Sequence, residues 1–165
     1  MIKNNKKKIK NLKKQKIPIV CISAYTKPVA KIIDQFVDII LVGDSLGTVL
    51  YGFESTREVS LDMMINHGRA VVNGSKHSIV IVDMPYGSYE KSKHLALKNA
   101  KNILKLSGAD GVKLEGGIEI SETVSYLVKN NINVMGHIGM LPQKIKKIRD
   151  YKIFGRKKDE EKKNN

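Results

Sequence analysis

Three acidic residues, Asp44, Asp83 and Glu115, each close an apolar run that has the composition of a buried β-strand. Neighbouring parallel strands lie about 4.8 Å apart, so carboxylates at their ends can converge on one point. Three carboxylates, without thiols and with at most one imidazole nearby, suit a hard cation such as Mg²⁺. Water and substrate oxygens would complete the coordination shell of such an ion. The pattern predicts a magnesium site; for any single aspartate, N-capping of a helix is the ordinary alternative.

A lysine accompanies the last of these carboxylates. Lys113 lies two residues before Glu115, so both side chains point to the same face of the expected strand. An ammonium beside a carboxylate cluster can neutralise a substrate carboxylate or a developing enolate. Three carboxylates and one lysine together favour a catalytic site over four unrelated surface features.

The elements that must hold these residues alternate along the chain. The expected strands are 17–25, 38–44, 78–84, 111–115 and 133–138, and the expected helices are 28–36, 61–72, 94–106 and 121–129. Nearly continuous apolar strands separated by helices indicate a parallel sheet covered on both faces. The handedness of crossover connections then leaves two α/β architectures, the closed (β/α)8 TIM barrel and the open doubly wound sheet. Both place active sites at the carboxyl ends of their strands.

The pattern stops after the fifth expected strand. A (β/α)8 barrel takes about 250 residues and at least about 200, whereas this chain has 165. We therefore expect a partial TIM barrel with about five of eight strands. The predicted organisation is a basic, disordered arm over 1–16, a βα-repeat barrel portion of the catalytic type over 17–143, and a charged tail over 144–165.

The net charge of +14 belongs to the two ends. Residues 1–16 hold eight lysines and no acid, residues 144–165 hold ten basic and four acidic residues, and the segment between them has twelve of each. Such ends bind polyanions weakly by counterion release, and no motif of a specific nucleic-acid-binding module accompanies them. No membrane span or signal peptide is expected. The single cysteine, Cys21, fits a cytoplasmic protein and is expected to be buried.

Seven short motifs run through residues 17–156. They are 42–47 (VGDSLG), 52–56 (GFEST), 61–67 (LDMMINH), 83–89 (DMPYGSY), 112–117 (VKLEGG), 136–143 (GHIGMLPQ) and 151–156 (YKIFGR). Each is weak by itself, but in this order and at this spacing they resemble the ketopantoate hydroxymethyltransferase family. The resemblance implies a (β/α)8 enzyme that transfers a hydroxymethyl group from 5,10-methylenetetrahydrofolate to 3-methyl-2-oxobutanoate and yields 2-dehydropantoate.

The resemblance also implies roles for individual residues. By position in the motifs, Asp44, Asp83 and Glu115 would bind Mg²⁺, and Asp44, Ser45, Asp83 and Lys113 would contact the keto acid. The partners implied are this keto acid, the folate co-substrate and further copies of the chain in a homo-oligomer. The family's general base is a glutamate on a later strand, to which no residue here corresponds, so the catalytic base is unknown and impaired or absent activity is the main alternative.

Two different functions are also compatible with parts of the chain. Residues 43–46 spell the GDSL signature of a serine-hydrolase family, in which Ser45 would be the nucleophile, but the Asp-x-x-His block of that family is missing. The basic ends could make the chain a polyanion-binding protein. His137 is either an acid–base group, a metal ligand or a histidine hydrogen-bonded for structure, and His67 is expected to face a helix surface or a packing partner.

Overall fold

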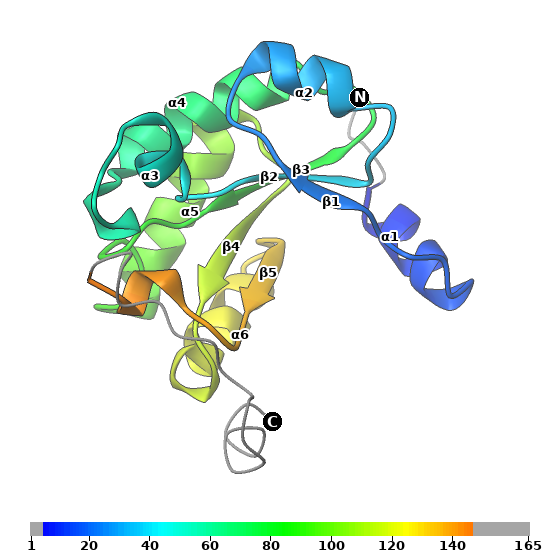
Figure 1. The fold of residues 1–165 in the computed structure, drawn as a ribbon. Helices are drawn as coiled ribbons and strands as arrows, with labels where there is room; N and C mark the ends of the chain where they lie inside the picture. Colours follow the sequence, from blue (N-terminus) through cyan, green and yellow to red (C-terminus); the bar gives the residue numbers. More distant parts are fainter. Residues whose placement is uncertain (1–4, 147–165) are drawn as a thin grey trace, which may run out of the picture.

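Five parallel strands form one curved sheet, and helices cover its outer face (Figure 1). The computed structural model describes residues 5–146. The strands are β1 (Cys21–Ser23), β2 (Ile39–Val42), β3 (Ile79–Asp83), β4 (Gly111–Glu115) and β5 (Val134–His137). The helices are α1 (Asn5–Lys14), α2 (Lys27–Ile33), α3 (Leu46–Leu50), α4 (Leu61–Val72), α5 (Lys93–Ser107) and α6 (Ser121–Lys129), with short 3₁₀ turns η1 (Thr56–Glu58), η2 (Ile118–Ile120) and η3 (Pro142–Lys144).

The strand order distinguishes between the two architectures that the sequence allows. Strands β1 to β5 lie in sequence order, each parallel to the next. A doubly wound sheet reverses its strand order at a switch point, whereas a barrel wall does not. The fold is therefore α/β and has the form of a partial TIM barrel with five strands, which confirms the predicted fold class.

The register assigns the strand residues to two faces. The outer face carries side chains that are almost fully buried against the helices and belong to the main core, among them Ile40, Val80 and Val112. On the inner face, Ile39, Ile79 and Ile81 form a second, smaller cluster. Side chains on successive strand positions alternate between the two faces. The inner face therefore carries this apolar cluster toward the amino ends of the strands and the acidic residues at their carboxyl ends.

Helix α1 closes part of the inner face. The sequence predicted a disordered basic arm over 1–16, but residues 5–14 are helical and Ile9 packs against the inner apolar cluster. Lysines surround this isoleucine in the sequence, so the sequence pattern does not reveal its contact with the inner cluster. The other predicted end, the tail 144–165, lies mostly outside the described residues, as does the motif at 151–156.

Cys21 differs from the expectation that it is buried. It lies on the edge strand β1, whose three residues are all exposed, and its thiol is free. Its apolar neighbours suggested burial, but among residues 5–146 strand β1 pairs only with β2. None of the helices in this part of the chain has the length and hydropathy needed to span a bilayer.

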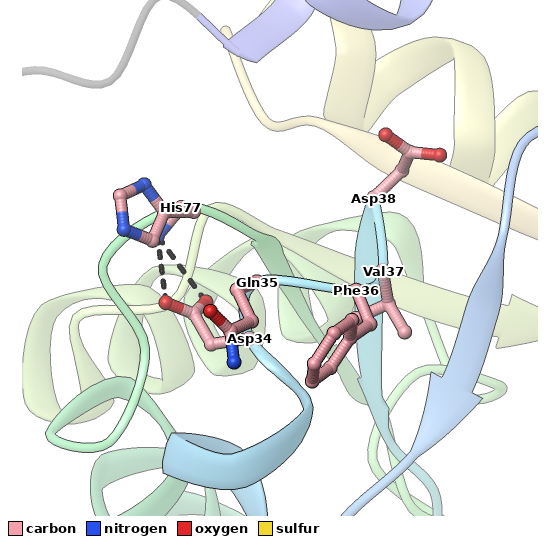
Figure 2. A pocket seen from close by; sticks show the side chains of 6 residues that line it. All are labelled: Asp34, Gln35, Phe36, Val37, Asp38 and His77. Carbon is pink, nitrogen blue, oxygen red and sulfur yellow. Dashed lines mark hydrogen bonds between the residues drawn. The ribbon is translucent and has the colours of Figure 1, made fainter.

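A hollow of about 400 Å³ lies at the amino ends of β2 and β3, away from the acidic strand ends (Figure 2). Here the Asp34 carboxylate accepts hydrogen bonds from Ser75 Oγ and from the backbone N–H groups of Lys76, His77 and Ser78. Burial alone would raise the pKa of Asp34, but these donors outweigh it and hold the pKa well below its usual range. Asp34 therefore serves to fix the loop that leads into β3.

Candidate active site

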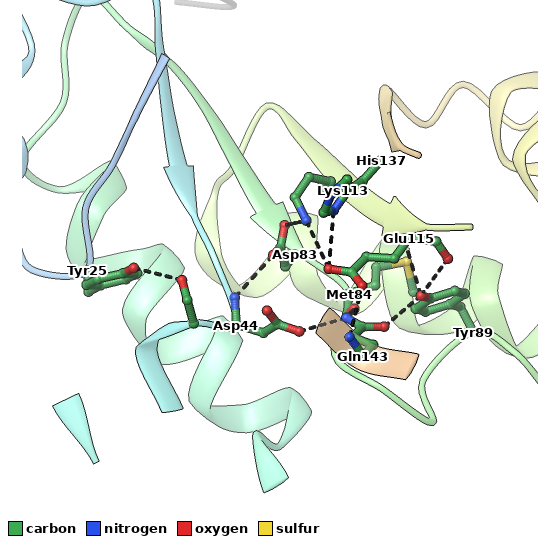
Figure 3. A network of polar contacts seen from close by, with 10 residues as sticks. Tyr25, Asp44, Asp83, Met84, Tyr89, Lys113, Glu115, His137 and Gln143 are labelled. Atoms are coloured by element: carbon green, nitrogen blue, oxygen red, sulfur yellow. Dashed lines mark hydrogen bonds and ion pairs between the residues drawn. The ribbon is translucent and has the colours of Figure 1, made fainter. Parts of the chain in front are cut away.

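The carboxyl ends of β2, β3 and β4 bring the predicted acidic residues together (Figure 3). Asp44 follows β2 closely, and its backbone N–H donates to Asp83 Oδ2 at 3.1 Å. Asp83 and Glu115 are the last residues of β3 and β4. Lys113 Nζ lies 2.9 Å from Asp83 Oδ1 and 3.8 Å from Glu115 Oε1. All four residues are at least 93% buried, because the curved sheet turns these ends toward its interior.

A fifth buried residue, Gln143, reaches the same cluster from the turn η3 after β5. Its side-chain Nε2 donates to Asp44 Oδ2 at 2.7 Å and to the Met84 carbonyl at 2.9 Å. Its backbone N–H donates to Glu115 Oε2 at 3.0 Å. Gln143 thus contacts residues that follow or end three different strands. It lies within the 136–143 motif, but its role in the site was not predicted.

Tyr89 and His137 border the cluster on the side of β4. Tyr89 is buried, and its hydroxyl lies 2.7 Å from Gln143 Oε1 and 3.0 Å from the Glu115 carbonyl. His137, the last residue of β5, is partly exposed, and its Nδ1 lies 3.3 Å from Glu115 Oε1. A histidine at this distance can act as an acid–base group or a structural partner of Glu115, and neither these two predicted roles nor that of a metal ligand is decided.

Ser45 lies at the start of α3, where its hydroxyl pairs with the Tyr25 hydroxyl at 2.8 Å. The Tyr25 carbonyl in turn accepts from His67 Nδ1 at 2.7 Å, and His67 Nε2 lies 2.8 Å from the Tyr51 hydroxyl. A carbonyl can only accept, so His67 carries a proton on Nδ1. The expectation that His67 meets a packing partner is confirmed, and that partner is the loop that positions Ser45.

The cluster has more negative than positive charge. Burial first, and then the neighbouring charge of Asp83, raises the pKa of Asp44 from 3.8 to about 7, despite the hydrogen bond from Gln143. Burial likewise raises the pKa of Asp83, although the Lys113 ammonium opposes this. With all three carboxylates ionised, one ammonium leaves a net charge of about −2. Two further positive charges, as one divalent cation brings, would balance this site.

The donor set and the charge fit a hard divalent cation, but the present side-chain positions do not form its ligand shell. Within residues 5–146, no three or more Asp, Glu, His or Cys side chains are grouped so that they could hold a metal ion. The contacts give the reason: Lys113 occupies oxygens of Asp83 and Glu115, and Gln143 occupies one oxygen each of Asp44 and Glu115. The predicted magnesium site stays a prediction, and it requires Lys113 to release the oxygens of Asp83 and Glu115.

Sequence comparison gives consistent matches over most of the chain. The family model for ketopantoate hydroxymethyltransferase matches residues 3–164. A 3-methyl-2-oxobutanoate hydroxymethyltransferase of Brucella canis is 53% identical over 147 residues, which are 89% of this chain and 54% of the relative. One from Rhizobium etli is 52% identical over 143 residues, 87% of this chain and 52% of the relative. The chain spans about half the length of the curated relatives it matches.

Solved structures with the same fold are more distant in sequence. A phosphonopyruvate hydrolase in complex with oxalate and Mg²⁺ superposes with a TM-score of 0.62 at 12% identity, over 80% of this chain and 51% of that one. A 2,3-dimethylmalate lyase of the PEP mutase/isocitrate lyase superfamily gives 0.60 at 15% identity, over 82% and 52%. These likenesses concern the fold, and they agree with the strand order described above.

Proposed function

We propose, from the premise that the chain belongs to the ketopantoate hydroxymethyltransferase family, that it serves hydroxymethyl transfer from 5,10-methylenetetrahydrofolate to 3-methyl-2-oxobutanoate, giving 2-dehydropantoate. The observation that carries the proposal is the buried network of three carboxylates and one lysine at adjacent strand ends. A keto acid presents a carboxylate and a carbonyl oxygen, which such a network binds well once a divalent cation is present.

In this proposal Asp44, Asp83 and Glu115 would hold Mg²⁺ as oxygen ligands. Bound there, the ion would supply Lewis acidity, which polarises the keto acid and makes its C3 proton more acidic. The protein's own contribution is to fix these carboxylates: a backbone N–H holds Asp83 Oδ2, and Gln143 holds one oxygen of each of the other two.

Lys113 and Ser45 would contact the substrate. The Lys113 ammonium is the only cationic group that contacts both Asp83 and Glu115 among residues 5–146, and it can transfer to the substrate carboxylate when a metal ion takes over these oxygens. The Ser45 hydroxyl is already oriented by Tyr25 and can turn its hydrogen toward a substrate oxygen. In a serine hydrolase a histidine would hold this hydroxyl, so the contact with a tyrosine favours substrate binding over nucleophilic attack.

Neither Glu119 nor Glu122 is suited to be the base that removes the C3 proton. Glu119 and Glu122 are exposed and pair with Lys144 and Lys93 on the surface. We expect proton abstraction to depend on a glutamate outside residues 5–146, as the family resemblance implies. Without that residue the chain would bind the keto acid but enolise it slowly, since a general base contributes about 10²- to 10⁴-fold in rate.

Proton exchange tests this function without folate. The 165-residue chain is mixed with 3-methyl-2-oxobutanoate in D₂O, with Mg²⁺ or with EDTA, and NMR follows ligand binding and loss of the C3 proton. We expect Mg²⁺-dependent binding in the wild type, a loss of binding in Asp83→Asn, no change in the exposed control Asp62→Asn, and slower exchange than in the full-length Brucella canis relative. Binding that is equally strong in EDTA, or unchanged in Asp83→Asn, would overturn the proposed site.

A further inference from the structure

We propose that Gln143 is a positioning residue, which orients Asp44 and Glu115 for a divalent cation, and that Tyr89 fixes the direction of its amide. The inference rests on the proposed function in one respect, namely that a cation binds between these carboxylates. Gln143 is 97% buried, and every hydrogen-bonding group of its side chain has a partner in the site. A buried amide with these partners has one low-energy position.

The partners of the amide determine which way it points. Nε2 lies 2.9 Å from the Met84 carbonyl and 2.7 Å from Asp44 Oδ2, and both of these oxygens are acceptors when Asp44 is ionised. A flipped amide would place its own oxygen against both of them, which is repulsive. The N–H₂ group therefore faces Asp44, and it fixes which of the two carboxylate oxygens stays available for a cation.

Tyr89 reinforces this orientation from the opposite side. Its hydroxyl has one proton and lies closer to Gln143 Oε1 than to the Glu115 carbonyl, at 2.7 Å compared with 3.0 Å. The shorter contact is the better hydrogen bond. The same hydroxyl accepts from the Glu115 backbone N–H at 3.3 Å. Tyr89 thus links the amide of Gln143 to the backbone that presents the Glu115 carboxylate.

The backbone of Gln143 completes the arrangement, because its N–H donates to Glu115 Oε2 at 3.0 Å. The following residues are anchored as well: Ser55 Oγ donates to the Ile145 carbonyl at 3.3 Å, and η3 packs against η1. One residue therefore holds Asp44 Oδ2 and Glu115 Oε2. The other oxygen of Asp44 is left for a cation, and Glu115 Oε1 becomes available to it once Lys113 and His137, which lie 3.8 Å and 3.3 Å away, give way. Groups of this kind, one shell outside a metal, typically change its affinity 10- to 100-fold.

The test measures Mn²⁺ binding to the 165-residue chain, with free Mn²⁺ counted by electron paramagnetic resonance and no keto acid present. Gln143→Leu keeps the size and the backbone N–H but removes the amide, and should raise the Kd about 10- to 100-fold. Tyr89→Phe removes one neutral hydrogen bond and should raise it about two- to tenfold. Gln35→Leu makes the same exchange at an exposed position at the opposite end of the strands and should leave the Kd unchanged.

The double variant separates positioning from general loosening of the fold. If Tyr89 acts through Gln143, the double variant binds Mn²⁺ no more weakly than Gln143→Leu alone, whereas independent structural damage would multiply the two effects. Circular dichroism shows whether each variant is folded at the measuring temperature. Wild-type binding with an unchanged Kd in Gln143→Leu overturns the inference and leaves the proposed function standing. A wild type that binds no Mn²⁺ overturns both.

Discussion

Replacing Asp44 by asparagine should stabilise the metal-free protein at neutral pH, although it removes a proposed metal ligand. Burial and Asp83 raise the pKa of Asp44 from 3.8 to about 7 in the folded protein. When the pKa of a carboxyl is higher in the folded than in the unfolded protein, the group stabilises the fold at pH values below its unfolded pKa. The unfolding free energy then falls as the pH rises from the unfolded pKa to the folded pKa. At 1.36 kcal/mol per pKa unit, the wild type loses up to about 4 kcal/mol between pH 4 and pH 7. Asparagine does not ionise, so Asp44→Asn escapes this loss.

The measurement is urea unfolding in EDTA at pH 5 and pH 8. The advantage of Asp44→Asn over the wild type should grow by about 2–3 kcal/mol between these values, since roughly two of the three pKa units lie above pH 5. Asparagine can still accept the N–H of Gln143, so the packing is largely kept. Asp62→Asn, an exposed change on α4, is the matched control and should show no such trend.

Added Mg²⁺ should reverse the order. It stabilises whichever variant binds it, in proportion to the logarithm of its concentration over Kd. We expect Mg²⁺ to raise the unfolding free energy of the wild type at pH 8 and to have little effect on Asp44→Asn. The reasoning is refuted if the two proteins have equal stability at pH 8 in EDTA, or if their difference is the same at pH 5.

Three further substitutions probe the packing and charge balance of the fold. Lys113→Met leaves two buried carboxylates without their ammonium and should lower the unfolding free energy at pH 8 by about 3–5 kcal/mol; an effect as small as that of the exposed Lys105→Met in urea titrations contradicts it. Asp34→Asn should lower the unfolding free energy by about 1–3 kcal/mol at pH 7. Because the pKa of Asp34 in the folded protein lies below 3.8, this difference should shrink as pH falls below 4. Urea titrations that give the same difference at pH 7 and pH 3 contradict this. Gly47→Ala would place a methyl 2.5 Å from a valine methyl and should cost about 1–3 kcal/mol, whereas Gly136→Ala, which meets nothing within 4 Å, should not; equal thermal melting of the two variants contradicts this.

The sequence predicted strands β2 to β5 well and the edge strand β1 poorly. The strand expected at 111–115 is β4 itself, and those at 38–44 and 78–84 contain β2 and β3 with few residues to spare. Central parallel strands are apolar on both faces, which is a local signal. The first expected strand, 17–25, shrinks to three residues because its extent depends on neighbours that a local pattern does not contain. The short helix α3 was missed for the opposite reason: five residues carry too little periodicity.

Some residues of the candidate site could likewise be predicted from the sequence, and others could not. The carboxylates and Lys113 could be predicted because strand ends and a two-residue spacing place them without knowledge of any loop. Gln143 could not, because it lies 99 residues from Asp44 and reaches it only through the path of the turn after β5. The contacts of Tyr89 were missed for a related reason, since a tyrosine in a loop after a strand has no pattern that separates packing from hydrogen bonding.

The positions of the hydrogen-bond donors explain why we expect the metal-free site to lower the stability of the fold. One oxygen of each carboxylate accepts from a neutral N–H, which fixes direction without cancelling charge, and Lys113 is the single ammonium that contacts the cluster within residues 5–146. A fold selected for stability alone would replace one of the carboxylates by a neutral residue. That three remain, with the pKa of Asp44 raised to about 7, is what we expect of a site that binds a positively charged ligand. The instability expected of the metal-free site and its proposed affinity for a cation therefore have one physical origin.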